Sequence, residues 1–216
     1  MKSNIIIIDY GVGNLLSIGQ AVERCGFKVS ITSDEKTISK ASHIILPGVG
    51  AFGYAMNELK KRNLDKIIMQ SAKKGINILG ICLGMQLLFN ESLEFGNHEG
   101  LKILEGEVIP IPSLNSLKNI LKIPNIGWYE LQEPKNLEIF KKNLLFNISY
   151  SKFVYFVHSF MCKPINTKNI LAYYDFSEIK IPAIVKKNNI FGCQFHPEKS
   201  GEVGLKIIDN FCNFNE

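Results

Sequence analysis

The amino-acid sequence predicts an α/β fold with an open, largely parallel central sheet and flanking helices. Strand signals alternate with helix signals through the first half of the chain, in the order that parallel sheets require. Continuous apolar runs such as Ile5–Ile8 are typical of strands that are covered on both faces. Because we find no internal repeat and no linker-like segment, residues 1–216 are expected to form one domain.

Glycines separate the elements that we predict in the first half of the chain. The strand Ile5–Ile8 ends in a glycine-rich turn, and a helix then runs from Leu15 until Cys25-Gly26 stops it. The other strands of this half are predicted over residues 27–31, 43–46 and 76–81, and the other helices over 52–61, 64–74 and 85–89. Strand, loop and helix therefore follow one another in the βαβ order.

Beyond Gly96 the helical signal fades, and short strand candidates replace it. These candidates cover residues 107–111, 155–157, 170–174, 184–186 and 191–195, and some of them are expected to pair antiparallel. The chain closes with an amphipathic helix over residues 201–214.

The composition points to a cytoplasmic protein without a cofactor or metal. Its net charge of +5 comes from scattered lysines, with no long basic block that would suggest nucleic acid. The five cysteines form no CxxC pair and no cluster with zinc-ligand spacing, which favours reduced thiols in a reducing compartment. The isoleucine run near the N-terminus is too short to span a membrane, so we expect no membrane partner.

The strongest local signal is the segment Gly80–Gly84, which reads Gly-Ile-Cys-Leu-Gly between a predicted strand and a predicted helix. It has the form of a nucleophile elbow, in which a sharp turn exposes the central residue. The following helix would direct its free N–H groups at the Cys82 sulfur, and the N–H of Leu83 would stabilise an oxyanion. A buried structural cysteine is the alternative, but the flanking strand and helix favour a reactive one.

A thiol nucleophile needs a base that a third group holds in place. Of the four histidines, His43 opens a strand and His98 lies in a polar loop, so both are expected to be structural or solvent-facing. His196 follows an apolar strand and precedes Pro197, which prevents helix continuation and helps to project the histidine. Glu198 is then placed to orient the imidazole, as the acid does in a catalytic triad. An ordinary His-Pro turn is the alternative.

These residues together resemble the triad-type glutamine amidotransferases, whose domain has a flavodoxin-like sheet. More closely, the chain is similar to the glutaminase subunits of imidazole glycerol phosphate synthase, nearly end to end. The resemblance rests on four motifs in the family's order, at residues 8–15, 46–52, 80–89 and 195–200.

The resemblance implies a role for each matching residue. Cys82 would form a γ-glutamyl thioester, His196 would move protons, and Glu198 would support it. The oxyanion hole would comprise Gly48, Val49 and Leu83, and the Pro47–Gly50 loop would rearrange before it serves. L-Glutamine would be held by a set of residues from three segments: Gly50, Gln86, Glu94, Tyr155, His158, Ser159 and Phe160. The alternatives are that Gln86 is an exposed helical residue and that 155–160 is only a core strand.

The resemblance also implies a partner, a (βα)8-barrel synthase subunit in a heterodimer. Ammonia would pass through a tunnel to that subunit, which makes imidazole glycerol phosphate and AICAR in histidine biosynthesis. Asn14, Asn125, Trp128 and Lys199 would lie at the docking face. Trp128 sits in a predicted turn, where an aromatic interface anchor is reasonable and a buried core tryptophan is the alternative.

One segment departs from the family pattern. Residues 124–129 read Pro-Asn-Ile-Gly-Trp-Tyr, where the histidine-pathway subunits usually read Pro-His-Met-Gly-Trp-Asn, and Phe160 replaces a usual tyrosine. We expect these changes to fall at the synthase-facing surface. They raise an alternative in which a paralogous glutaminase feeds ammonia to a surface-sugar amidotransferase that makes amidino sugars. A catalytically silent regulatory partner, and an elbow-type cysteine peptidase or γ-glutamyl hydrolase, are further alternatives.

Overall fold

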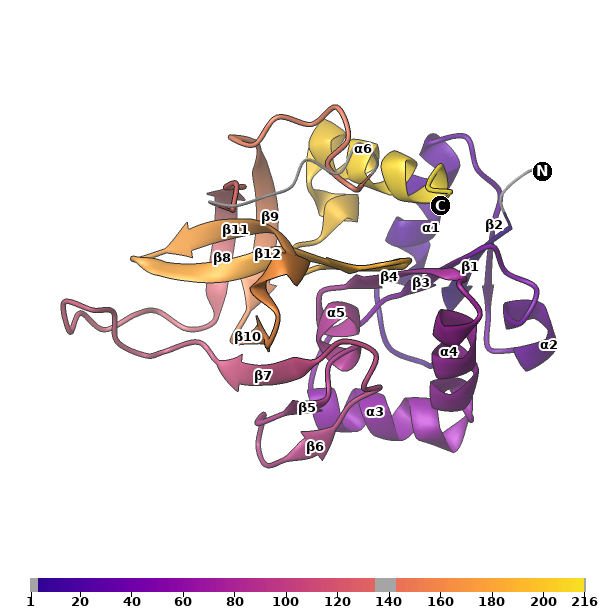
Figure 1. Cartoon of the computed structure of the whole chain (residues 1–216), viewed down its shortest axis with the longest axis horizontal. Helices are drawn as coiled ribbons and strands as arrows, with labels where there is room; N and C mark the ends of the chain where they lie inside the picture. Colours follow the sequence, from indigo (N-terminus) through magenta and orange to yellow (C-terminus); the bar gives the residue numbers. More distant parts are fainter. Residues whose placement is uncertain (1–3, 135–142, 216) are drawn as a thin grey trace.

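A seven-stranded sheet forms the centre of the computed structural model, which describes residues 4–134 and 143–215 (Figure 1). Its strand order is β11-β12-β13-β4-β3-β1-β2. The pairs from β13 to β2 are all parallel, whereas β12 runs antiparallel to both of its neighbours. The strands are β1 (Ile5–Ile8), β2 (Val29–Thr32), β3 (His43–Leu46), β4 (Asn77–Ile81), β11 (Ile170–Phe176), β12 (Ile179–Lys187) and β13 (Ile190–Cys193). The predicted fold class is confirmed.

Helices cover both faces of this sheet (Figure 1). One face carries α1 (Leu15–Arg24) and α6 (Gly201–Cys212), and the other carries α3 (Phe52–Lys61), α4 (Leu64–Lys73) and α5 (Leu83–Leu87). The isoleucines of β1 alternate between the two cores, with Ile5 and Ile7 in one and Ile6 and Ile8 in the other. All four are at most 1% exposed, and burying each contributes roughly 1.5–3 kcal/mol.

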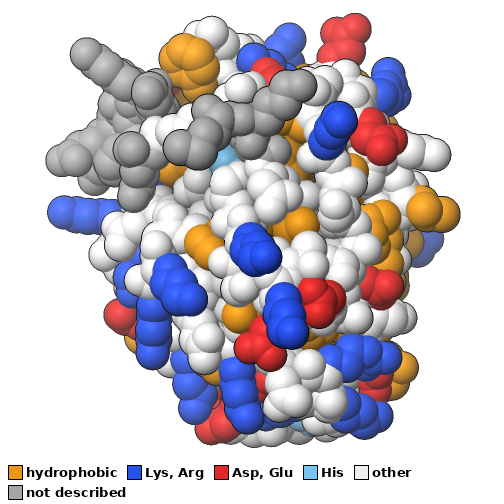
Figure 2. All heavy atoms as spheres, turned by 90° about the vertical axis from the view of Figure 1, so that its right-hand side faces the viewer, with side chains coloured by type: hydrophobic (Ala, Val, Ile, Leu, Met, Phe, Trp, Pro, Cys, Tyr) orange, Lys and Arg blue, Asp and Glu red, His pale blue; other side chains and the backbone are white. Residues whose placement is uncertain are grey.

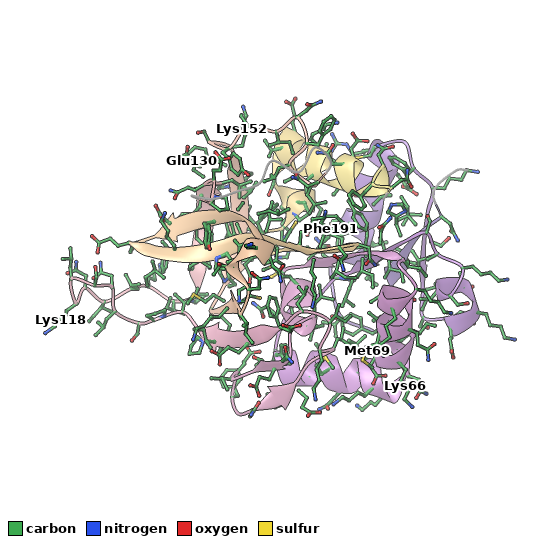
Figure 3. The ribbon with its side chains drawn as sticks, viewed as in Figure 1. Lys66, Met69, Lys118, Glu130, Lys152 and Phe191 are labelled. Carbon is green, nitrogen blue, oxygen red and sulfur yellow. The ribbon has the colours of Figure 1, made fainter. Side chains whose placement is uncertain are left out.

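Aromatic side chains fill the layer between the sheet and α6. Figure 3 shows Phe191 of β13 inside this layer, where its ring packs edge-on against Phe211 at 6.1 Å and against Phe214 at 4.9 Å. This packing requires β13 to be apolar, as predicted for a strand of a parallel sheet that is covered on both faces.

Two smaller sheets extend the structure beyond the central one. One has the order β10-β7-β5-β6, formed by β10 (Phe160–Pro164), β7 (Gly106–Pro110), β5 (Glu91–Ser92) and β6 (His98–Glu99). The other is the antiparallel pair of β8 (Asn125–Glu130) and β9 (Phe153–His158). A loop between β7 and β8 extends away from the molecule, and Lys118 lies near its tip (Figure 3).

The structure differs from the predicted elements mainly where pairing is long-range. Residues 124–129 were predicted as a turn, whereas 125–130 form the strand β8, whose partner β9 lies far along the chain. The short elements β5, β6, β10 and α2 (Glu35–Ile38) were not predicted either. The predicted helix 85–89 instead spans Leu83–Leu87, so it starts directly after Cys82. The closing helix ends at Cys212 rather than at 214.

Surface charges of both signs are interspersed on the face that Figure 2 draws. At the C-terminal end of α3, Glu58 pairs with both Lys61 and Arg62. Among the described residues, no helix has the length and apolar character that crossing a membrane requires.

Candidate active site

Cys82 lies in a strained turn between β4 and α5. Its backbone angles are φ 53° and ψ −113°, outside the regions that side-chain-bearing residues ordinarily adopt. Its N–H donates to the Cys193 carbonyl at 2.7 Å, which ties the turn to the neighbouring strand β13. The turn therefore presents the sulfur at the carboxyl end of the parallel strands, where open α/β sheets place their sites.

Both glycines of the elbow are required by close backbone packing. A Cβ on Gly80 would lie 2.6 Å from the Gly84 carbonyl oxygen, and a Cβ on Gly84 would lie 1.8 Å from the Leu46 carbonyl oxygen. Real Cβ atoms do not approach backbone this closely. The motif spacing thus reflects how tightly α5 packs onto β4 and β3.

His196 lies beside Cys82 and is held there by Glu198, Tyr155 and Ser200. Its Nδ1 lies 2.9 Å from Glu198 Oε1, its N–H donates to the Tyr155 carbonyl at 3.0 Å, and its own carbonyl accepts from the Ser200 hydroxyl at 2.7 Å. The Ser200 hydroxyl accepts in turn from the Tyr155 N–H at 3.0 Å. With Nδ1 engaged by the carboxylate, Nε2 is the nitrogen left for the sulfur.

The charge state of His196 follows from its neighbours. Burial lowers the pKa of His196, but hydrogen bonds and attraction to Cys82 and Glu198 together outweigh it and raise the pKa to about 10. The imidazole is therefore protonated at neutral pH. A charged histidine beside a cysteine is the arrangement that activates thiol nucleophiles.

The Glu198 side chain is buried, and Asn14 donates a hydrogen bond to it as well. The Glu198 side chain is fully buried, and its Oε1 also accepts from Asn14 Nδ2 at 3.4 Å. Its Oε2 is buried without a hydrogen-bond partner among the described residues. Asn14, predicted at a docking face, is thus half-buried and in contact with Glu198.

A cavity opens above Cys82, and most of the predicted substrate residues line it. The lining residues that were predicted are Val49, Gly50, Leu83, Gln86, Glu94, His158, Ser159 and Phe160, together with Cys82 and His196. Pro124 and Val157 also line the cavity and were not predicted. Tyr155 does not line it. Its backbone instead fixes His196, and its ring lies against Trp128 at 5.9 Å.

Gln86 is buried rather than an exposed helical residue, so that alternative is wrong. It is 5% exposed, and its Nε2 donates to the Phe160 carbonyl at 3.1 Å and to Gln194 Oε1 at 3.0 Å. Gln194 was missed, although a polar residue inside an apolar strand was the available signal. Its Nε2 lies 3.7 Å from the Cys82 sulfur.

The Pro47–Gly50 loop is pinned at one end and open at the other. The Pro47 carbonyl accepts from the buried Tyr10 hydroxyl at 2.7 Å. Gly48 is buried so tightly that a Cβ would lie 2.8 Å from the Gly84 nitrogen, whereas Val49 is 43% exposed at the cavity mouth. Val49, from this loop, and Leu83, from the elbow, therefore both line the cavity.

The residues predicted at a docking face do not share one environment. Trp128 is 53% exposed and Lys199 is exposed, so the buried-core alternative for Trp128 is wrong. Asn125, in contrast, is 1% exposed, and its amide donates to the Tyr174 hydroxyl at 2.8 Å. The expectation that Asn125 contacts a partner is wrong, because residues alternate in and out along β8 and Asn125 points inward. Tyr129 also packs inward, against Tyr174 at 5.1 Å, so only Ile126 of the three departures within residues 124–129 is exposed.

No group of three or more His, Cys, Asp or Glu side chains within 4–134 and 143–215 is placed to hold a metal ion.

Comparison with known proteins identifies the family. A model of glutamine amidotransferase class-I matches residues 6–213. The chain belongs to this family. The class-I glutamine amidotransferase assignment confirms the predicted enzyme class.

Relatives narrow the resemblance within the class-I glutamine amidotransferases. The chain is 46% identical over 209 residues to an imidazole glycerol phosphate synthase subunit HisH of Legionella pneumophila, covering 97% of this chain and 98% of the relative. It is 48% identical over 207 residues to the same-named subunit of Lactococcus lactis, covering 96% of each. The predicted resemblance to these subunits is confirmed.

Solved structures support the fold. A structure of PurLQS from Thermotoga maritima matches with a TM-score of 0.70 at 23% identity, covering 99% of each chain. A crystal structure of a glutamine amidotransferase matches with a TM-score of 0.68 at 16% identity, covering 93% of this chain and 94% of the other.

Proposed function

We propose that this chain is a glutaminase subunit that hydrolyses L-glutamine to glutamate and ammonia through Cys82, His196 and Glu198. One observation supports this above the others: the strained Cys82 lies beside a histidine whose Nδ1 is 2.9 Å from a fully buried carboxylate. This arrangement matches the requirement for a nucleophile, a base and an orienting acid. The alternative of a catalytically silent partner gives no physical reason for burying a carboxylate there.

In the proposed reaction, the Cys82 thiolate attacks the side-chain amide carbon of glutamine. The oxyanion that forms would accept hydrogen bonds from the N–H of Leu83 and from an N–H of the loop at Val49. The protonated His196 would then give its proton to the departing nitrogen, so that ammonia leaves and a thioester remains. Neutral His196 would next take a proton from water as the water attacks the thioester, which releases glutamate and restores the thiolate.

The cavity offers groups for the two ends of the amino acid. The Glu94 carboxylate, which accepts from the Phe52 N–H, is the acidic group available for the α-amino group of glutamine. The turn 158–160, which also lines the cavity, supplies Ser159 and backbone groups for the α-carboxylate. We therefore propose that glutamine lies between Glu94 and this turn, with its amide at Cys82.

For the ammonia, we propose delivery to a (βα)8-barrel synthase subunit in a heterodimer, as in histidine biosynthesis. Support comes from the two relatives named as synthase subunits, which align over nearly the whole chain. The exposed Trp128 and Ile126 on β8 and the exposed Lys199 beside the triad are the groups proposed for docking. An exposed tryptophan flanked by apolar surface is typical of an interface anchor.

A second candidate keeps the glutaminase and changes the recipient to a surface-sugar amidotransferase. It is favoured by the departures in residues 124–129 and at Phe160, which lines the cavity. Because Asn125 and Tyr129 pack inward, Ile126 is the exposed change that remains to support it.

The chemistry is tested by glutamine hydrolysis in the complex that co-purifies with this chain. We expect Cys82→Ser to abolish hydrolysis and labelling by a thiol-alkylating glutamine analogue, whereas Cys193→Ser, in the adjacent buried strand, retains both. Hydrolysis that survives Cys82→Ser would exclude Cys82 as the nucleophile. Growth of a histidine auxotroph lacking its own glutaminase subunit tests the recipient, and failure to restore growth with a stable, soluble chain would favour the second candidate.

A further inference from the structure

Three polar side chains from three strands form a buried hydrogen-bonded chain that leads to the cavity wall. Asn125 of β8 donates from Nδ2 to the Tyr174 hydroxyl of β11 at 2.8 Å, and that hydroxyl lies 2.7 Å from Nε2 of His158 on β9. Nδ1 of His158 lies 2.8 Å from the Phe160 carbonyl. Tyr174 is fully buried, Asn125 is 1% exposed and His158 is 6% exposed.

The direction of each hydrogen bond in this series follows from the groups at its two ends, the Phe160 carbonyl and the Asn125 amide. The Phe160 carbonyl can only accept, so His158 Nδ1 must carry the proton. Burial, helped by the charge on nearby His196, outweighs the hydrogen bond to Phe160 and lowers the pKa of His158 to about 4, so the ring is neutral and Nε2 accepts. The Tyr174 hydroxyl then donates to Nε2 and accepts from the Asn125 amide.

The same chain ends on the wall of the glutamine cavity. The Phe160 carbonyl also accepts from Gln86 Nε2 at 3.1 Å, and Gln86 leads through Gln194 to the Cys82 sulfur. The turn 158–160 is therefore held at both ends, by the hydrogen bonds of His158 and by Gln86 of the elbow helix, which donates to the Phe160 carbonyl. Neither Asn125 nor Tyr174 lines the cavity.

We propose that Tyr174 and Asn125 are positioning residues for glutamine binding: they hold His158 as the neutral Nδ1–H tautomer, and through it they fix the turn 158–160. This inference rests on the proposed glutaminase function. Residue 125 lies in the segment that departs from the family pattern. In this proposal, Asn125 acts on the substrate cavity from inside the protein, through Tyr174 and His158.

The tyrosine ring and its hydroxyl have separable roles. The ring packs against Phe156 at 4.0 Å and against Tyr129 at 5.1 Å, which makes it part of the core. Tyr174→Phe keeps this packing and removes only the hydrogen bonds. Tyr150→Phe is the matched control, because its hydroxyl donates to the Leu171 carbonyl at 3.2 Å and takes no part in the chain to the cavity.

The first readout is the saturation of Cys82 labelling by the thiol-alkylating glutamine analogue, together with glutamine hydrolysis in the co-purified complex. We expect Tyr174→Phe to raise KM and the half-saturating analogue concentration about tenfold, with kcat and the maximal labelling rate within about twofold. Asn125→Leu should have a smaller effect, and the double variant should equal Tyr174→Phe, because Asn125 acts through the hydroxyl. Equal effects in Tyr150→Phe, no effect in Tyr174→Phe, or additive effects would overturn the proposal.

Nitrogen NMR of the full chain supplies a readout that does not depend on catalysis. We expect His158 as the Nδ1–H tautomer in the wild-type chain and in Tyr150→Phe, and a shifted Nε2 signal in Tyr174→Phe. An Nε2–H tautomer in the wild-type chain would overturn the proposal even if glutamine is hydrolysed. If no glutamine hydrolysis is found, the proposed function fails, while the tautomer still reports on the hydrogen-bonded chain.

Discussion

His196 and Glu198 lie two residues apart, and their side chains meet at 2.9 Å because Pro197 begins a single 3₁₀ turn, Pro197–Lys199, after strand β13. The Glu198 carboxylate is fully buried there. A buried carboxylate is costly unless it is paired, so its main compensating interaction is with the imidazolium. The orientation of the base and the charge that sustains it thus come from one local turn.

We expect Glu198→Gln to reduce kcat/KM for glutamine hydrolysis by about a hundredfold or more, since the amide neither sustains the imidazolium nor specifies its orientation. The measurement is steady-state hydrolysis in the co-purified complex. Glu202→Gln, at an exposed position in the first turn of α6, is the control and should leave the rate unchanged. Equal rates for the two variants would remove Glu198 from the mechanism.

The raised pKa of His196 predicts how stability depends on pH. Its pKa is about 10 in the folded chain and about 6.5 when unfolded, so the stabilisation is complete below about pH 6.5 and is lost as the pH rises toward 10. We expect the free energy of unfolding in urea to fall across this window more steeply for the wild-type chain than for His196→Asn. Parallel pH profiles for the two would contradict the prediction.

Gly84→Ala should destabilise the chain by about 3 kcal/mol or more, because the added methyl group would lie 1.8 Å from the Leu46 carbonyl oxygen. Gly19→Ala in α1 is the matched control. Its methyl group would meet only side chains, at 3.7 Å or more, and the helix should gain about 0.5–1 kcal/mol. Urea unfolding measures both, and a stable Gly84→Ala would mean that the elbow can open.

Trp128→Ala should leave the free energy of unfolding within about 1 kcal/mol, since the side chain is 53% exposed. If Trp128 anchors the partner, the variant should weaken the complex by about 2 kcal/mol or more in a titration with the co-purified subunit. Leu117→Ala is the control, since it truncates another exposed apolar side chain on the loop between β7 and β8. An unchanged Kd for Trp128→Ala would place the docking face elsewhere.

Much of the central sheet was predictable because its signals are local. The isoleucines of β1, the helix 52–61 and the strand 43–46 were predicted with the bounds that the structure has. Each is specified by apolar patterning and by adjacent turn residues. The strand β8 was not predictable in this way, because its pairing partner β9 is separated from it by a long stretch of chain.

The sequence by itself singled out the proposed nucleophile, base and acid, because the elbow spacing and the His-Pro-Glu turn are local geometries that few residue types satisfy. Only the tertiary structure decided the direction of Asn125, the burial of Gln86 and the joining of His158 to Tyr174. These depend on which face of a strand meets the core, and on the register of strands far apart in the chain. The elbow could therefore be predicted from five consecutive residues. The residues that line its cavity could be assigned only from the pairing of strands that lie far apart in the sequence.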